Sequence, residues 1–150
     1  MSLEIVYSFS YLIYPPILAK EGDRTMFIFA NPNPAKLLVE DCVIRAISIL
    51  KDQPWLKTYD DVTDKGRTMF NMPSSNPVWN RYLQDSHFRR NILPNTCPEC
   101  YTVIDFCRDH PYGEFMLATG THVITVIDGN YYDTWDSGDE VPIYYYEKER

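Results

Sequence analysis

The stretch Gly120–Ser137, GTHVITVIDGNYYDTWDS, decides the fold, because it predicts a β-hairpin after a run of helices. Strand-like sequence lies on both sides of residues 128–130, Asp-Gly-Asn, which are a strong turn signal. The hairpin places His122 near its first open end and an aspartate near its last. An imidazole beside a carboxylate is typical of a catalytic base with an orienting partner, and such a pair needs a nucleophile elsewhere in the chain.

The identity of the aspartate that faces His122 depends on the register of this hairpin. A three-residue loop, residues 128–130, sets His122 opposite Asp136. A two-residue loop shifts the pairing by one residue and turns Asp133 toward the histidine instead. We expect Asp136 to be the partner, with Asp133 as the alternative.

Upstream of the hairpin, apolar residues recur at helical spacing. Residues 41–50, DCVIRAISIL, predict a helix with Asp41 as its N-cap, so that Cys42 lies in the first turn. Further helices are expected in three places: after Pro54, within residues 72–84 and over residues 101–109. His87 is expected near the end of the third helix.

After residue 110 the hydrophobic period changes to two, which indicates strands. Four of them are expected, in residues 113–120, 121–128, 130–136 and 141–148. A short strand is also expected after Met26. Because helices lead and strands follow, the predicted class is α+β, with N-terminal helices packed on a C-terminal antiparallel sheet in one domain over residues 26–150.

Composition excludes several classes of function. The 150 residues carry a net charge of −7, which argues against a nucleic-acid partner because phosphate binding needs a cationic surface. No apolar stretch is long enough to cross a membrane, and Glu4 with Pro15–Pro16 argues against a signal peptide. We therefore expect a cytoplasmic protein whose four cysteines are thiols rather than a disulfide framework.

The first 25 residues share no pattern with the rest of the chain. Codons for residues 20–23, Lys-Glu-Gly-Asp, can spell a purine-rich ribosome-binding sequence at a short distance before Met26. We therefore expect translation to begin at Met26, with residues 1–25 a non-native or upstream read-through extension. The intact mass of protein expressed from its native locus tests this expectation.

Cys42 is the candidate nucleophile. A cysteine in the first turn of a helix lies at the positive end of the helix dipole, which favours the reactive thiolate. His122 on a strand could pair with that thiolate, and a carboxylate on the next strand could hold the imidazole ring. The chain order of cysteine, histidine and aspartate, with a helix first and a sheet after it, is the topology of papain-like folds.

Four segments carry a resemblance to a known family: NPNP…EDCVIRAISIL, MPSSNPVWNRYL, LPNTCPECYTVIDF and THVITVIDGNYYDTWDSGDEVPIYYYEK. Together they resemble small papain-like cysteine-peptidase-fold proteins of bacteriophages and mobile elements of Gram-positive bacteria. The resemblance covers Met26 to the C-terminus and implies a triad of Cys42, His122 and Asp136. The resemblance does not imply a substrate. By analogy with the fold we expect a protein or peptide substrate in the cytoplasm of the host cell, and the substrate's identity and the oligomeric state stay open.

The predicted activity is that of a cysteine hydrolase or acyltransferase acting on an amide or ester bond, with peptide or isopeptide bonds favoured. It needs no metal or cofactor. The oxyanion of the intermediate would be held by the backbone N–H of Cys42 and one upstream side-chain donor. Papain-like enzymes use a glutamine there; this chain has none, and Asn33 or Asn31 is expected to substitute.

Two other functions compete with this prediction. A catalytically silent, phage-encoded protein could bind a host factor through an acidic, tyrosine-rich surface. A small zinc-stabilised binding module could use four residues with zinc-ligand chemistry: Cys97, Cys100, Cys107 and His110. Against zinc, no second C-x-x-C motif is present, and Cys107 lies on a helix face that should be buried. Trp79 and Trp135 could line a cleft, but we expect them to pack in the core.

Overall fold

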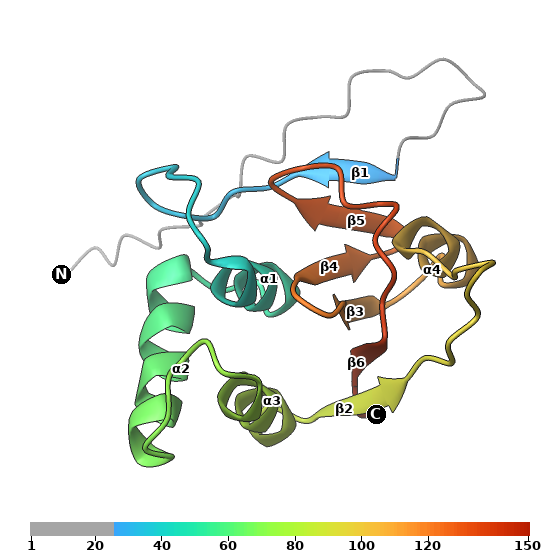
Figure 1. Ribbon diagram of the computed structural model, residues 1–150. Helices are drawn as coiled ribbons and strands as arrows, with labels where there is room; N and C mark the ends of the chain where they lie inside the picture. The colour runs from blue at the N-terminus through green and yellow to red at the C-terminus, as the bar shows by residue number, and fades with distance from the viewer. Residues whose placement is uncertain (1–25) are drawn as a thin grey trace, which may run out of the picture.

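The computed structural model describes residues 26–150, which form four helices and one six-stranded sheet (Figure 1). The α+β class predicted from the sequence is therefore confirmed. The expectation that residues 1–25 are an upstream extension lies outside the described residues. Among residues 26–150, no helix combines the length and the apolar character needed to span a membrane.

The elements follow the chain in this order: β1 (Phe27–Phe29), α1 (Cys42–Leu50), α2 (Trp55–Thr68), α3 (Asn76–Asp85), β2 (Phe88–Ile92), α4 (Val103–Asp109), β3 (Glu114–Ala118), β4 (Val123–Ile127), β5 (Asn130–Asp133) and β6 (Tyr144–Lys148). The strands are arranged in the sheet as β1-β5-β4-β3-β6-β2. The sheet is mixed, because β1 runs parallel to β5 while every other pair is antiparallel.

Two hydrophobic cores lie on opposite faces of the sheet. Helices α1, α2 and α3 cover one face, and α4 covers the other (Figure 1). The alternation along β3 explains the division, because Met116 and Ala118 pack toward α1 whereas Phe115 and Leu117 pack toward α4. Burial on both faces fixes the register of the central strands, and therefore the positions of the residues at their ends.

The β4–β5 hairpin turns over a two-residue loop. Ile127 pairs with Asn130, and the loop residues Asp128 and Gly129 both have positive φ angles, +48° and +74°. These angles belong to a type I′ turn, whose twist matches that of the flanking strands. The expectation of a three-residue loop is therefore wrong.

Two features of the sheet were not predicted from the sequence. β2 occupies residues 88–92 and pairs with β6, although this segment was interpreted only as the end of a helix. Helix α3 instead stops at Asp85, and His87 has a φ of +64°, which turns the chain out of the helix and into the strand. The sheet is also not wholly antiparallel, because β1 returns to pair in parallel with β5.

Candidate active site

Cys42 is the first residue of α1, and its thiol is partly buried. The helix forms because the segment that follows is apolar on the side that meets the sheet, with Ala46, Ile47 and Leu50 buried in the core. Asp41 occupies the N-cap position, but its carboxylate makes no capping hydrogen bond, contrary to the expectation from the sequence. No side chain therefore caps the first-turn N–H groups of α1, including that of Cys42.

His122 lies immediately before β4, in the short loop that follows β3. Its backbone N–H donates to Thr119 Oγ1 (3.0 Å), and its carbonyl accepts from the Thr119 N–H (2.8 Å). These two bonds fix the position of the backbone, and the imidazole is only 13% exposed. Because Nε2 is bonded to a carboxylate, Nδ1 is the ring nitrogen left to interact with Cys42.

The carboxylate that holds His122 belongs to Asp133, the last residue of β5. Nε2 of His122 lies 2.6 Å from Asp133 Oδ2, and the carboxylate is 1% exposed. Three further donors fill its remaining positions: Ser137 Oγ (2.7 Å), Arg45 Nη2 (2.9 Å) and the Thr134 N–H (2.8 Å). A buried carboxylate with every position occupied is held in one orientation, and so is the imidazole bonded to it.

The preference for Asp136 as the orienting residue was wrong. Its carboxylate accepts from the hydroxyl of Tyr131 and from the N–H of Gly138 (3.3 Å), so Asp136 caps the turn after β5. The two-residue hairpin loop is the cause, because that register brings Asp133, the alternative named from the sequence, to the side of His122.

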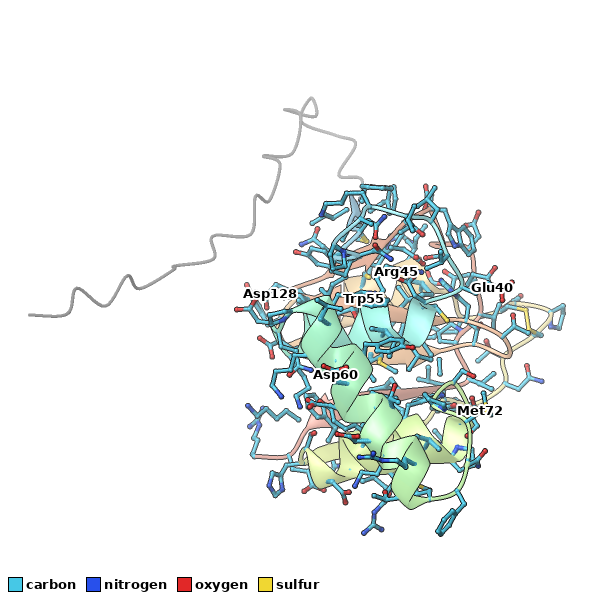
Figure 2. All side chains as sticks on the ribbon, turned by 90° about the vertical axis from the view of Figure 1, so that its left-hand side faces the viewer. Glu40, Arg45, Trp55, Asp60, Met72 and Asp128 are labelled. Atoms are coloured by element: carbon cyan, nitrogen blue, oxygen red, sulfur yellow. A yellow bond between two sulfur atoms is a disulfide. The ribbon has the colours of Figure 1, made fainter. Side chains whose placement is uncertain are left out.

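Arg45 extends the network into α1. Its guanidinium is buried and is paired both with Asp133 and with Asp41, one helical turn earlier. The second carboxylate oxygen of Asp41 accepts from Trp55 Nε1 (2.9 Å), which ties the start of α2 to the same cluster (Figure 2). Sequence reasoning missed Arg45. The available signal was an arginine within the apolar helix CVIRAISIL, four residues after an aspartate.

The expectation that Trp135 packs in the core was also wrong. Its side chain is 46% exposed, and its ring centroid lies 5.3 Å from that of His122. The indole therefore lies beside the imidazole at the edge of the site and belongs to neither hydrophobic core. Trp79, by contrast, is buried in the core on the α1 side of the sheet, as expected.

The surroundings shift the pKa values of His122 and Cys42 so that each group favours its own charged form. Burial would lower the pKa of His122, but hydrogen bonds and charges from Asp133 and Cys42 raise it to about 9. Burial would raise the pKa of Cys42, but His122, the backbone N–H of Val123 and the charge of Arg45 outweigh burial and lower it. Both shifts favour a thiolate–imidazolium pair near neutral pH.

The pKa of Asp133 also lies below its ordinary value. Burial opposes ionisation of this carboxylate, but the hydrogen bonds from His122 and Ser137 outweigh that effect. Asp133 therefore remains a carboxylate while it holds the imidazole.

Cys42 and His122 open onto a cleft of about 450 Å³. Its wall includes residues from the segment before α1 and the start of α1, from α2, from the start of α3 and the loop before it, from the β3–β4 loop and from β6. In Figure 2, Glu40 and Met72 lie toward the same edge of the molecule; Glu40 lines the cleft, and Met72 directly precedes the lining residues Pro73 and Ser74. The thiol is thus reachable by a substrate, while the side chains of Asp41, Arg45 and Asp133 behind it are buried.

Neither asparagine expected to complete the oxyanion site lines this cleft. Asn33 is buried in its own loop, where its Oδ1 accepts from the Ala35 N–H (2.9 Å), and Asn31 Nδ2 donates to the Leu37 carbonyl (3.2 Å). Both side chains stabilise the turn before α1. Of the oxyanion donors expected from the sequence, the backbone N–H of Cys42 is the one that lies at the site, and no side chain caps it.

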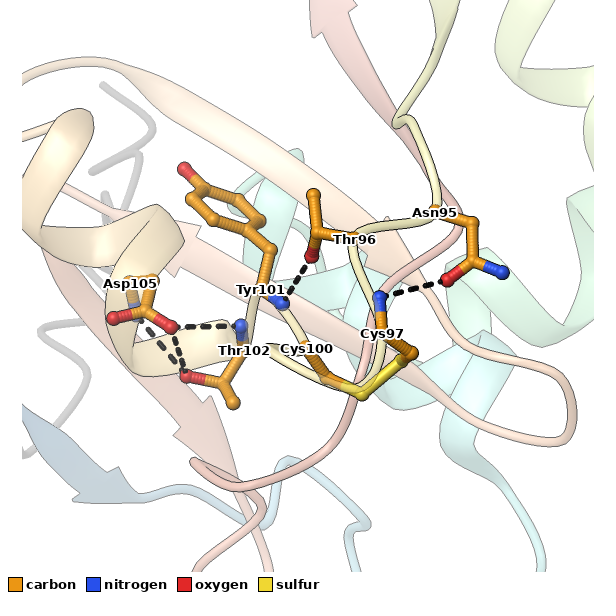
Figure 3. Close-up of a disulfide and its surroundings, with 7 residues drawn as sticks. All are labelled: Asn95, Thr96, Cys97, Cys100, Tyr101, Thr102 and Asp105. Atoms are coloured by element: carbon orange, nitrogen blue, oxygen red, sulfur yellow. Dashed lines mark hydrogen bonds between the residues drawn. A yellow bond between two sulfur atoms is a disulfide. The ribbon is translucent and has the colours of Figure 1, made fainter.

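The four residues considered for zinc are not brought together. Cys97 and Cys100 form a disulfide, which corrects the expectation that all four cysteines are thiols (Figure 3). Cys107 is buried, which raises the pKa of its thiol to about 12, and His110 stacks on Phe106 with ring centroids 3.8 Å apart. Within residues 26–150, no group of three or more metal-ligating side chains is present.

The disulfide loop is ordered by its own hydrogen bonds. The Cys97 N–H donates to Asn95 Oδ1 (3.0 Å), and the Tyr101 N–H donates to Thr96 Oγ1 (2.8 Å) (Figure 3). A capping box between Thr102 and Asp105 then starts α4. None of these residues lines the cleft beside Cys42.

Comparison with known proteins gave no match: no family model, no curated protein and no solved structure is significantly similar to this chain. Inference about its function therefore rests on the geometry and chemistry of the site.

Proposed function

We propose that this chain is a papain-like cysteine hydrolase or acyltransferase that acts on an amide or ester bond, with peptide or isopeptide bonds as the favoured targets. The observation that carries the proposal is the succession of contacts from Cys42 to His122 to Asp133 at the edge of a cleft. The residue types, their order and the direction of both pKa shifts are those required for nucleophilic acyl transfer.

In the first half of the reaction, the Cys42 thiolate attacks the carbonyl carbon of the substrate. The carbonyl electron pair moves to oxygen, where the Cys42 N–H at the start of α1 stabilises the negative charge. His122 gives its proton to the departing amine or alcohol as the tetrahedral intermediate collapses to a thioester. Asp133 stabilises the imidazolium and keeps Nδ1 directed at the sulfur.

In the second half, His122 accepts a proton from water, and the resulting hydroxide attacks the thioester carbonyl. The carbon–sulfur bond breaks and Cys42 leaves as the thiolate, which completes hydrolysis. An amine that takes the place of water gives acyl transfer by the same route. Neither half requires a metal or a cofactor to balance.

The test measures the pH dependence of iodoacetamide labelling at each cysteine by peptide mass spectrometry. We expect Cys42 to label well below the ordinary thiol pKa of about 8.5, and to lose this reactivity in His122→Ala. Cys107 is an internal control, because its buried thiol should label slowly at every pH. If Cys42 labels no faster than Cys107, or if His122→Ala leaves its profile unchanged, the proposed nucleophile is wrong.

A binding protein without turnover is the second candidate, and one observation favours it. Neither of the two asparagines expected to provide the second oxyanion donor lines the cleft, and the Nδ2 of Asn31 donates to the Leu37 carbonyl instead. This candidate predicts that Cys42 labels like an ordinary thiol, and that a binding partner is retained by Cys42→Ala.

A further inference from the structure

Four aromatic side chains belong to the wall of the cleft beside Cys42. Trp55 and Tyr59 on α2 are stacked with ring centroids 5.2 Å apart. Trp79 of α3 and Tyr144 of β6, which are largely buried in the core, form a second stacked pair at 6.4 Å behind the same cleft. Two rigid aromatic pairs that face one space form a surface suited to an apolar group.

The charges at the cleft disfavour an anionic occupant. No lysine or arginine belongs to the part of the wall formed by described residues. Its acidic members are Glu40, which is exposed at the rim, and Asp41. The imidazolium of His122 on this wall is already engaged by Asp133 and by the Cys42 thiolate. A carboxylate or phosphate entering here would therefore meet like charge and no free cation to compensate for its lost hydration.

A cationic occupant is also poorly matched. The two oxygens of Asp41 are already engaged by Arg45 and by the indole of Trp55. An ammonium group seated beside the aromatic pairs would lose water, and the carboxylate still open to it, Glu40, lies exposed at the rim. An uncharged side chain has no charge to desolvate, and it gains the burial of its apolar surface.

The apolar surface continues outside the cleft along the chain that leads into α1. Leu37, Leu38 and Val39 are three consecutive exposed apolar residues, and Val39 also forms part of the cleft wall. An exposed apolar run continuous with a binding cleft is typical of a surface that contacts a polypeptide. The occupant is therefore longer than one side chain.

We infer that the cleft beside Cys42 binds an uncharged aromatic or branched aliphatic side chain of a peptide segment, next to the bond that is attacked. The attack on the neighbouring bond rests on the proposed function. The preference for an uncharged side chain rests only on the residues that line the cleft. The two can therefore fail separately.

Binding is tested in the full-length Cys42→Ala variant, which cannot react, by NMR titration with three capped peptides. They are N-acetyl-glycyl-phenylalanine amide and its lysine and aspartate counterparts. We expect the phenylalanine peptide to bind at least about fivefold more tightly than either charged peptide, with amide shifts mapping to residues 118–123 and the start of α1. Tighter binding of the lysine or aspartate peptide, or shifts that map elsewhere, would overturn the inference.

A matched pair of variants assigns the binding to the aromatic wall. Tyr59 is 47% exposed and lines the cleft, so Tyr59→Ala should weaken binding of the phenylalanine peptide by about fivefold. Tyr112 is 83% exposed and does not line the cleft, so Tyr112→Ala should leave the affinity unchanged. Equal effects of the two substitutions would contradict the inference. If the cleft prefers the phenylalanine peptide but Cys42 does not react with iodoacetamide, only the proposed function is refuted.

Discussion

At the scale of single residues, the assignment of the orienting carboxylate gives opposite expectations for two nearby aspartates. Asp133→Asn removes the negative charge beside Nε2 of His122 while keeping the size of the side chain. The pKa of His122 should then fall and that of Cys42 should rise, because Asp133 is the main cause of the first shift. We expect iodoacetamide labelling of Cys42 at pH 6 to slow by about tenfold or more.

Asp136→Asn is the matched control for that prediction. Its carboxylate bonds Tyr131 and Gly138 and contacts neither member of the thiolate–imidazolium pair. The labelling profile of Cys42 should keep its wild-type midpoint in this variant. A loss of low-pH labelling in Asp136→Asn, with Asp133→Asn unaffected, would restore the triad first predicted from the sequence.

Arg45 should stabilise the fold because its guanidinium forms ion pairs with two buried carboxylates. Replacing it by glutamine leaves Asp41 and Asp133 buried without their shared cation. Removing one partner of a buried ion pair costs about 3–5 kcal/mol, so Arg45→Gln should lower the free energy of unfolding by roughly 3 kcal/mol. Urea denaturation measures this change.

Arg67→Gln is the comparison for Arg45→Gln, because Arg67 also forms an ion pair but is largely exposed. Its removal should change the free energy of unfolding by less than about 1 kcal/mol. If both variants lost the same small amount of stability, Arg45 would not be part of a buried network.

At the scale of elements, the turn between β4 and β5 determines which aspartate reaches His122, so its glycine is a sensitive position. Gly129 has a φ of +74°, and an added Cβ would lie 3.2 Å from the carbonyl oxygen of Cys107. We expect Gly129→Ala to lower the free energy of unfolding by about 1 kcal/mol or more, measured as a lower Tm.

Gly120 provides a control for this glycine substitution in the loop before the same hairpin. An added Cβ there meets no atom within 4 Å, and its backbone does not lie in the left-handed region. Gly120→Ala should therefore leave Tm within about 1 °C of wild type or raise it slightly. A larger loss for Gly120→Ala than for Gly129→Ala would show that the turn is not of the type described.

Local pattern predicted most elements because each of them buries one face. The apolar spacing of CVIRAISIL and the alternation of EFMLA follow directly from the two cores that they contact. Local pattern missed β2, FRRNI, because an edge strand with two exposed arginines carries no alternating apolar signal. The parallel pairing of β1 with β5 joins segments about a hundred residues apart and leaves no local trace.

The site was predictable to the level of residue type but not of exact partners. Cys42 and His122 were named from the sequence because a helix start and a strand start are local features. The choice of Asp133 depends on positive φ angles at Asp128 and Gly129, which the motif Asp-Gly-Asn permits without requiring. Arg45 depends on a contact across 88 residues, which only the packing of α1 against the sheet reveals.

At the scale of the whole molecule, a thiolate–imidazolium pair has a consequence for stability against pH. His122 has a raised pKa of about 9 in the folded chain, against an ordinary value of 6.5. Its contribution is fully present below pH 6.5 and is lost as the pH rises through 9. Cys42 has a lowered pKa, so its contribution is present above its ordinary value of 9.0 and is lost as the pH falls through the lowered value.

The two contributions have opposite slopes and should cancel in the wild type. Where the folded pair is charged and the unfolded residues are neutral, both states bind the same number of protons, so their joint contribution to the unfolding free energy is flat. Cys42→Ser removes one slope and leaves the other. Because Asp133 still holds the proton on His122, stability should then fall from pH 6.5 upward, by at most about 1.4 kcal/mol per pH unit.

Urea denaturation at pH steps from 6 to 9.5 measures these slopes, and subtracting the curve of the Cys42→Ser/His122→Gln double variant removes the contribution of all other groups. The double variant should lack the fall seen in Cys42→Ser, because it has no imidazole to titrate. A difference curve for Cys42→Ser that stays flat over this range would mean that His122 is neutral in the fold. The proton would then remain on the sulfur, and the electrostatic basis of the proposed nucleophile would be lost even though its geometry is intact.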